Sequence, residues 1–520
     1  MELIKEHITL NEDIFRDISN TAADGDIIVP DKKPDILKIL QVDAQSVITA
    51  KSVSGSCITV EGKINLKILY VPDRADEKIK SIITDIEFTH RVDNPQINEG
   101  MSVRCVSDVQ RIEFNVINSR KLNVKAVVSV ETSAGCERAI NIVTGIKHDG
   151  CCETETKPIC IYNTLADNEE EFVVRGNVDI PSGKMSLKEL LKYDCHITDK
   201  EIKVMNGKVI LKGTVESCFL FTGEDNNIDF METDTPFTEV FEVSEAYEDA
   251  LCEYSCSIAD VYAVINEDSD GDMRIISFEY LINVHIRICR NTEPDVVSDF
   301  YCPGFNTDIT RSDCRIDEIV CHPKMQTTVR ENISIDSGMP PIDRVYNVIT
   351  KAYINKTSID AGKLTVQGII DSYILYLSES IDSPVSSFKK EIPFSYVIDA
   401  PGADSDTECI VAAETEHTSY NINMSDEVEI RTALIINARI VRPKNISLID
   451  DAVISDIGDD RKHGMVIYFV QKNDKLWDIA KRYRVSCEDI LKINEDLDKN
   501  ALKPGSRIII PMMRKYSRTV

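Results

Sequence analysis

The stretch ITVEGKINLKILYV, residues 58–71, has one glycine between apolar residues and ends in an apolar-aromatic triplet. Two more stretches align with it without gaps, VILKGTVESCFLFT at 209–222 and LTVQGIIDSYILYL at 364–377. The aligned glycines, Gly62, Gly213 and Gly368, are separated by 151 and then 155 residues. This regular spacing predicts that the chain repeats one structural unit three times. A repeated glycine inside a strand indicates a bulge or a close approach of backbone.

The likeness between the three copies extends to both sides of the glycine. About 25 residues after it, each copy has a strand that opens with a phenylalanine, namely Phe88, Phe237 and Phe394. About 26 residues before it, each copy has apolar residues at helical spacing: Ile36, Ile39 and Leu40; Leu187, Leu190 and Leu191; Ile342, Val345 and Tyr346. Alternating strands with short polar turns are typical of antiparallel sheets. We therefore expect a mainly β protein with three antiparallel sandwiches or open barrels, each with a short helix near its start.

The repeats also predict the domain boundaries. We expect β domains at 1–143, 172–290 and 332–442, a polar linker at 443–463, a small domain at 464–511 and a basic tail at 512–520. The segments 144–171 and 291–331 are rich in Cys, Asn and acidic residues, and we interpret them as linkers or docking edges.

The composition excludes several classes of protein. The net charge of −29 argues against a nucleic-acid partner, although residues 465–520 alone carry 12 Lys and Arg against 7 Asp and Glu. The N-terminus lacks the features of a secretory signal, and no apolar run is long enough to cross a bilayer, so we expect a cytosolic protein. The 16 cysteines include no C-x-x-C pair, which favours reduced thiols over a zinc site.

No catalytic motif stands out in the chain. Phosphate loops, nucleophile elbows, H-E-x-x-H pairs and dinucleotide fingerprints are all missing from the sequence. We therefore predict no catalytic residues, no cofactor and no bound metal. Paired carboxylates of the glycosidase type stay open as an alternative, because the fold rather than the sequence creates such pairs.

The last 50 residues or so follow a different pattern. A strand at about 466–470 leads into a helix whose apolar residues are Leu476, Ile479, Ala480 and Tyr483. Asp474 is placed to cap this helix, and Ser486 with Asp489 is placed to begin a second one. After a turn at 503–505 comes a closing strand at 508–510, which gives a βααβ unit.

This unit resembles a LysM domain over its whole length. The matching positions are Tyr468, Val470, Asp474, Leu476, Trp477, Ile479, Ala480, Tyr483, Val485, Ile490, Ile493, Asn494, Leu502, Pro504, Gly505, Ile508, Ile510 and Pro511. The resemblance implies binding of N-acetylglucosamine-containing glycans by the loops before the first helix and before the last strand. In the first loop Asn473 can take the left-handed conformation usually supplied by glycine. Lys475, however, replaces a small hydroxyl at the glycan-facing position, which argues against sugar binding.

Three acidic β repeats followed by a LysM module resemble the SipL family of spore-coat morphogenetic proteins, whose repeats are called SPOCS domains. The resemblance implies a non-enzymatic scaffold in the mother-cell cytosol of a sporulating bacterium. It also implies that the LysM module binds the coat-basement ATPase SpoIVA at the forespore surface, with other coat proteins as further partners. The alternative is a binder of glycan or peptidoglycan precursor through the same module.

Trp477, the only tryptophan, lies on the margin of the apolar stripe of its helix. At about 100° per residue it falls between Arg484 and Lys481, so it is either a packing residue at the rim or the anchor of an interface. The predicted partner-binding residues are Trp477, Lys475, Asp474, Lys472, Lys481, Arg484 and Asn494.

Overall fold

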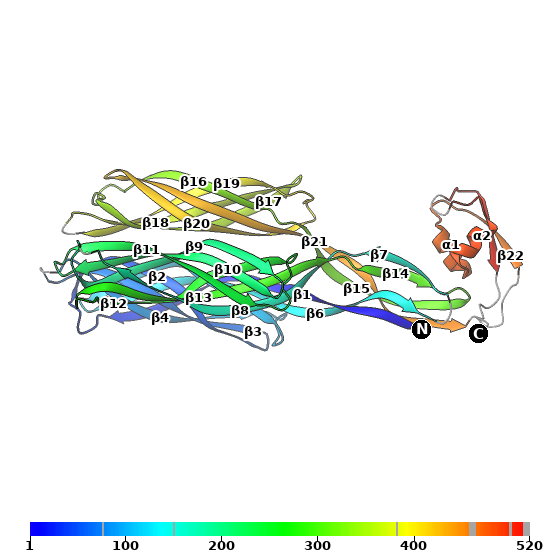
Figure 1. Ribbon diagram of the computed structural model, residues 1–520, viewed down its shortest axis with the longest axis horizontal. Coiled ribbons are helices and arrows are strands. Elements are labelled where there is room, and N and C mark those ends of the chain that lie inside the picture. Colours follow the sequence, from blue (N-terminus) through cyan, green and yellow to red (C-terminus); the bar gives the residue numbers. More distant parts are fainter. Residues whose placement is uncertain are drawn as a thin grey trace.

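The structure is a computed structural model that describes residues 1–74, 77–148, 151–181, 183–380, 383–456, 464–498 and 502–512. Strands dominate it, and its described residues form two helices, both near the C-terminus, which confirms the expected mainly β class. An elongated body narrows into a stalk, and a small module lies beyond the end of the stalk (Figure 1). Neither described helix has the length and apolar character needed to span a bilayer.

Each repeat is a sandwich of an inner and an outer antiparallel sheet. The inner sheets are β2 (Ile36–Ser54), β3 (Cys57–Pro72) and β4 (Lys80–Asp93); β9 (Leu187–Met205), β10 (Lys208–Gly223) and β11 (Ile228–Glu242); and β17 (Arg344–Asp360), β18 (Lys363–Leu377) and β19 (Val385–Asp399). The outer sheets are β1 (Glu2–Ile28), β6 (Lys121–Lys147) and β5 (Ser102–Asn118); β8 (Ile161–Asp179), β13 (Met273–Thr292) and β12 (Leu251–Glu267); and β16 (Lys324–Ser334), β21 (Glu427–Asp456) and β20 (Glu408–Met424). One apolar core fills the space between the two sheets of each sandwich.

The repeated glycine allows a phenylalanine ring to lie against the backbone of the central inner strand. Gly62 pairs with Phe88, Gly213 with Phe237 and Gly368 with Phe394 in the strand register. A Cβ atom on Gly62 would lie 2.4 Å from the Phe88 ring, which no real side chain tolerates. The expected close approach is therefore present in all three repeats. A phenylalanine ring from the neighbouring strand makes it, and at Gly62 and Gly368 a backbone carbonyl oxygen lies comparably close.

The prediction of a short helix near the start of each repeat is wrong, because the strands β2, β9 and β17 occupy these positions. Each strand carries a β-bulge in this stretch, as at Val345/Asn347 in β17. A bulge adds a residue to one strand and breaks the alternation of faces. In β2 the bulge at Ile36/Lys38 thus lets both Ile36 and Ile39 face the sandwich core while Leu40 points to the opposite side, a spacing that resembles that of a helix.

The three inner sheets meet around a common axis. In each apolar-aromatic triplet the outer two residues enter the sandwich core, as Ile68 and Tyr70 do in the first repeat. The middle residues, Leu69, Leu220 and Leu375, instead join one shared cluster between the repeats. Because equivalent residues of all three repeats form this cluster, the body has pseudo-threefold symmetry.

A charged group is buried close to this axis. Lys192 occupies the position equivalent to Gln41 and Asn347, and its side chain is 1% exposed. Its ammonium lies 2.9 Å from Asp194 of the same strand and 3.2 Å from Asp43 of the first repeat. Burial acts to lower the pKa of Lys192, but the two carboxylates outweigh burial and raise it, so the lysine is charged.

The segments 144–171 and 291–331, which we interpreted as linkers or docking edges, contribute paired strands to the stalk. Two short strands, β7 (Glu153–Pro158) and β14 (Asp295–Tyr301), pair as one ribbon. Another ribbon pairs β15 (Phe305–Cys321) with the end of β21, and the third is the outer half of β1 with β6. Their inward apolar residues share a core that includes Ile8, Ile142, Val296, Ile316 and Leu448.

These ribbons correct the interpretation of the segments between the repeats. Acidic and apolar residues alternate along them because each ribbon has one face in the stalk core and one in solvent. Residues 443–456 of the expected polar linker belong to β21 and are paired along their length. The remainder of that linker, 457–463, and residues 513–520 of the expected tail lie outside the described residues.

Candidate functional site

The small module has the βααβ order predicted from the sequence. Its strands are β22 (Gly464–Phe469) and β23 (Arg507–Met512), and its helices are α1 (Leu476–Tyr483) and α2 (Cys487–Ile493). Asn473 has the expected positive φ, 71°. The Ser486 hydroxyl accepts a hydrogen bond from the Asp489 backbone N–H at 3.0 Å and caps α2 as expected.

The predicted role of Asp474 as the cap of α1 is wrong. Lys475 is the residue at the cap position, and its side chain makes no capping hydrogen bond. The Asp474 carboxylate accepts hydrogen bonds from the Tyr468 hydroxyl at 2.6 Å and the Gln471 backbone N–H at 2.8 Å. Asp474 therefore closes the loop that precedes the helix rather than the helix itself.

One side of α1 is docked against the tip of the stalk through Asp299 of β14. The Trp477 indole N–H donates to the Asp299 carboxylate at 3.2 Å, and Lys481 Nζ donates to both of its oxygens at 2.7 and 2.6 Å. Arg311 of the stalk lies 3.4 Å from the same carboxylate. Two of the predicted partner-binding residues thus contact the chain's own stalk.

Tyr301, two residues after Asp299, makes the apolar part of this contact. It is 3% exposed and belongs to the same apolar cluster as Val470, Leu476 and Ile479 of the module. Its ring meets the Trp477 ring edge to face, with 5.0 Å between centroids, and its hydroxyl donates to the Val485 carbonyl at 2.9 Å. The stalk therefore inserts one side chain into the edge of the module's core.

The contact favours an ionised carboxylate at its centre. Burial acts to raise the pKa of Asp299, but the hydrogen bonds from Lys481 and Trp477 outweigh burial and hold the pKa below its usual range. At neutral pH the Asp299 carboxylate is thus a charged acceptor for both donors.

The other predicted partner-binding residues fall into two groups. The Asn494 side-chain amide donates to Ile490 and Ile509 carbonyls and accepts from the Ile509 N–H, so it ties α2 to β23 inside the module. Lys472, Lys475 and Arg484 are exposed, although the Arg484 carbonyl accepts a hydrogen bond from the Gly304 N–H of the stalk. Partner binding by the seven residues stays a prediction.

The module also has an exposed apolar face that the sequence analysis missed. Met465, Ile467 and Phe469 alternate along β22 and are 70%, 56% and 58% exposed. Residues that alternate in a strand share a face, and Ile467 is paired with Ile509 on β23. In Figure 1, α1 lies nearer to the stalk and β22 lies on the outer side of the module. The exposed face of β22 is therefore apolar, and the loop after this strand carries Lys472 and Lys475.

The sequence analysis also missed Asp299 and Tyr301. They lie in the segment 291–331, which we interpreted as a linker or docking edge without selecting residues. The available signal was the aromatic pair Phe300–Tyr301 within this segment. Docking places Tyr301 against the module and Phe300 in the stalk core.

A disulfide bond closes the β7/β14 ribbon directly below the docked module, which corrects the expectation of reduced thiols at two positions. Cys152 and Cys302 are bonded to each other, with 4.2 Å between their Cα atoms. Ligand atoms of His148 and both cysteines lie within 4.8 Å of one another, but the bond occupies both sulfurs. Cys314 and Cys321 follow Cys302 closely in the sequence but lie in other parts of the fold.

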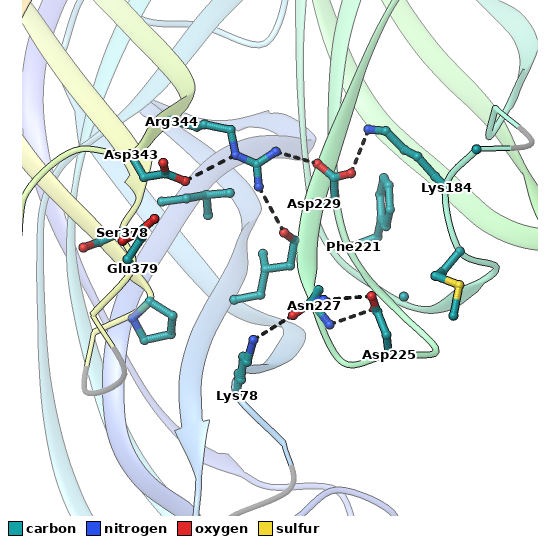
Figure 2. A pocket seen from close by; sticks show the side chains of 16 residues that line it. Lys78, Lys184, Phe221, Asp225, Asn227, Asp229, Asp343, Arg344, Ser378 and Glu379 are labelled. Atoms are coloured by element: carbon teal, nitrogen blue, oxygen red, sulfur yellow. Dashed lines mark hydrogen bonds and ion pairs between the residues drawn. The ribbon is translucent and has the colours of Figure 1, made fainter. Parts of the chain in front are cut away.

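A cavity of about 520 Å³ lies where loops of the three repeats meet. Figure 2 shows that several of its polar side chains, among them Arg344, Asp229 and Lys184, contact one another. Asp229 accepts from Arg344 at 2.9 Å and from Lys184 at 2.7 Å, and Lys78 donates to Asn227 at 2.8 Å. Because the contacts of Arg344 and Lys78 each join two repeats, the cavity is best explained as an interface within the body.

Comparison with known families assigns both the three repeats and the small module. The model of the SipL SPOCS domain matches residues 35–117, 186–266 and 341–423, and the LysM model matches residues 468–511. The chain belongs to the SipL family. No curated protein and no solved structure matches the chain.

Each SPOCS match in this SipL-family protein covers only part of a sandwich. The first match runs from β2 to β5, so it omits the outer strands β1 and β6 that complete the fold. The same strands continue into the stalk. Neither SPOCS nor LysM is an enzymatic domain family, and a LysM domain indicates a binding role.

Proposed function

We propose that this SipL-family protein is a non-enzymatic adaptor in spore coat assembly. It binds the coat-basement ATPase SpoIVA through its LysM module and helps to localise the coat around the forespore, in the mother-cell cytosol. The three sandwiches act as the structural body, and other coat proteins are further candidates for contacts with them. The stalk sets the module apart from the body, where a large partner meets little steric hindrance.

The observation that carries this proposal is the open apolar face of β22. Three large apolar side chains, Met465, Ile467 and Phe469, are more than half exposed within one six-residue strand. Contiguous apolar groups on a surface, with polar residues around them, are typical of protein-binding sites. The exposed lysines of the adjoining loop favour a partner surface that is apolar at its centre and acidic at its edge.

The test is capture of purified SpoIVA by the full chain and by an Ile467→Asp variant. We expect the variant to lose at least about tenfold in affinity, since a charge would be buried against an apolar partner. The matched control is Ile18→Asp on β1, where the isoleucine is 63% exposed. Equal capture by all three proteins would contradict the proposed face. Binding of chito-oligosaccharide without capture of SpoIVA would favour the glycan-binding alternative.

A further inference from the structure

The side of α1 that faces the stalk has the composition of a recognition surface. Trp477 offers a ring and an N–H donor, and Lys481 offers a cation one helical turn later. Tryptophan is enriched among the residues that dominate binding energy, because it combines a large apolar area with a polar group. In the structure this face is covered by Asp299 and Tyr301 of the stalk.

The stalk shows what kind of ligand fits this face. Asp299 and Tyr301 are two residues apart in the strand β14, and both point toward the module. The carboxylate satisfies the two donors, and the aromatic ring fills the space beside Trp477 and the edge of the module's core. An extended segment with the same carboxylate and ring would make the same contacts.

The docked contact is also of a kind that can be released. The side chains of Lys481 and Asp299 remain 36% and 20% exposed, and an ion pair with that much solvent access contributes little to the stability of a contact. The apolar part rests on one tyrosine ring. By contrast, the repeats of the body share a continuous apolar cluster.

We propose that the Trp477–Lys481 face binds an extended acidic segment of a protein partner that presents a carboxylate and an aromatic ring two residues apart. Strand β14 occupies the face as an internal competitor. This rests on the proposed function, since the module is taken as the partner-binding part of the chain. The internal competitor lowers the apparent affinity for a partner by the fraction of molecules in which the face is free.

The test uses the full chain and a peptide with the sequence of residues 294–303, in which serine replaces Cys302. Trp477 is the only tryptophan, so its fluorescence reports on this face alone. We expect Asp299→Ala to free the face, and the variant to bind the peptide about threefold to fivefold more tightly than the unaltered chain, because a partly solvated ion pair shifts such an equilibrium by no more than about fivefold. Asp308→Ala, which changes an exposed aspartate of the stalk, is the control and should bind like the unaltered chain.

Two results would overturn the proposal. One is equal affinity of the Asp299→Ala variant and the unaltered chain for the peptide, with far-UV circular dichroism showing both folded. The other is undiminished peptide binding after Lys481→Glu is added to Asp299→Ala. Capture of SpoIVA by the same variants tests the proposed function separately: peptide binding without capture would retain the recognition face and remove SpoIVA as its partner.

Discussion

Two lysine–aspartate pairs join separate parts of this chain, and they differ in their access to water. Near the axis of the body, Lys192 is 1% exposed and contacts Asp194 and Asp43. At the tip of the stalk, Lys481 is 36% exposed and contacts Asp299. A buried charge cannot lose its partner without a large penalty, whereas an exposed one exchanges its partner for water. The first pair therefore fixes the repeats together, and the second suits a contact that opens.

The largest effect is expected at the axis. Lys192→Ala leaves the Asp194 carboxylate buried without its cation, and the free energy of unfolding should fall by about 3 to 5 kcal/mol. Urea unfolding of the full chain measures this. Lys203→Ala on the exposed side of β9 is the control. A loss below about 1 kcal/mol, the value for exposed pairs, would remove the contrast between the two sites.

The repeated glycines provide a second, graded test within the body. A Cβ at Gly368 would lie 2.1 Å from the Tyr353 carbonyl oxygen, whereas at Gly213 the nearest atom is 2.7 Å away and belongs to the Phe237 ring. A ring can shift more easily than backbone, so Gly368→Ala should lower the free energy of unfolding by about 1 to 3 kcal/mol and Gly213→Ala by less. Calorimetric or urea unfolding of both variants would show the order, and a reversed order would contradict this account of the close approach.

A smaller effect on stability is expected at the tip. Lys481→Ala should change the unfolding of the body by less than about 1 kcal/mol, because the pair is partly solvated. It should nevertheless raise the access of acrylamide to Trp477, as measured by fluorescence quenching. Lys492→Ala on the exposed side of α2 is the matched control within the module. Unchanged quenching in Lys481→Ala would show that the apolar contact of Tyr301 alone holds the module.

The smallest effect is the dependence of docking on pH. The pKa of Asp299 is lowered in the docked state, so its contribution is complete above the ordinary value of 3.8 and is lost as the pH falls through the lowered pKa. Lys481 and Arg311 are the charged groups that face it. Trp477 fluorescence should therefore show a step on acidification that Asp299→Asn removes. Persistence of the step in that variant would assign it to other carboxyl groups.

The sequence predicted the repeats well because their signals are local. One glycine, one triplet and one phenylalanine recur at fixed spacing, and each reports on the pairing of neighbouring strands. The bulges in β2, β9 and β17 led to the wrong prediction of helices. A bulge shifts the alternation of apolar residues along a strand, and the resulting spacing is the same as in a helix. The stalk was missed because its strands pair with partners far away in sequence, such as Phe305 with Asp456.

The site was predictable in part. The module, its order of elements and the place of Trp477 on the margin of the first helix followed from the residues within one short segment. The hydrogen-bond partner of Trp477 could not be predicted in this way, because Asp299 lies 178 residues earlier in the chain. The open face of β22 was also hidden, since alternating apolar residues in a strand do not show which of the two faces is covered.

The axis of the body also shows what is gained by encoding three repeats in one polypeptide. A homotrimer with lysine at this position would bring three ammonium groups together, and they would repel one another in a poorly solvated space. The single chain places Gln41, Lys192 and Asn347 at the equivalent positions, so one cation lies beside two neutral amides. The repeats share a fold but are not interchangeable: a chain with its repeats exchanged or duplicated would lose the match between this lysine and its two carboxylates.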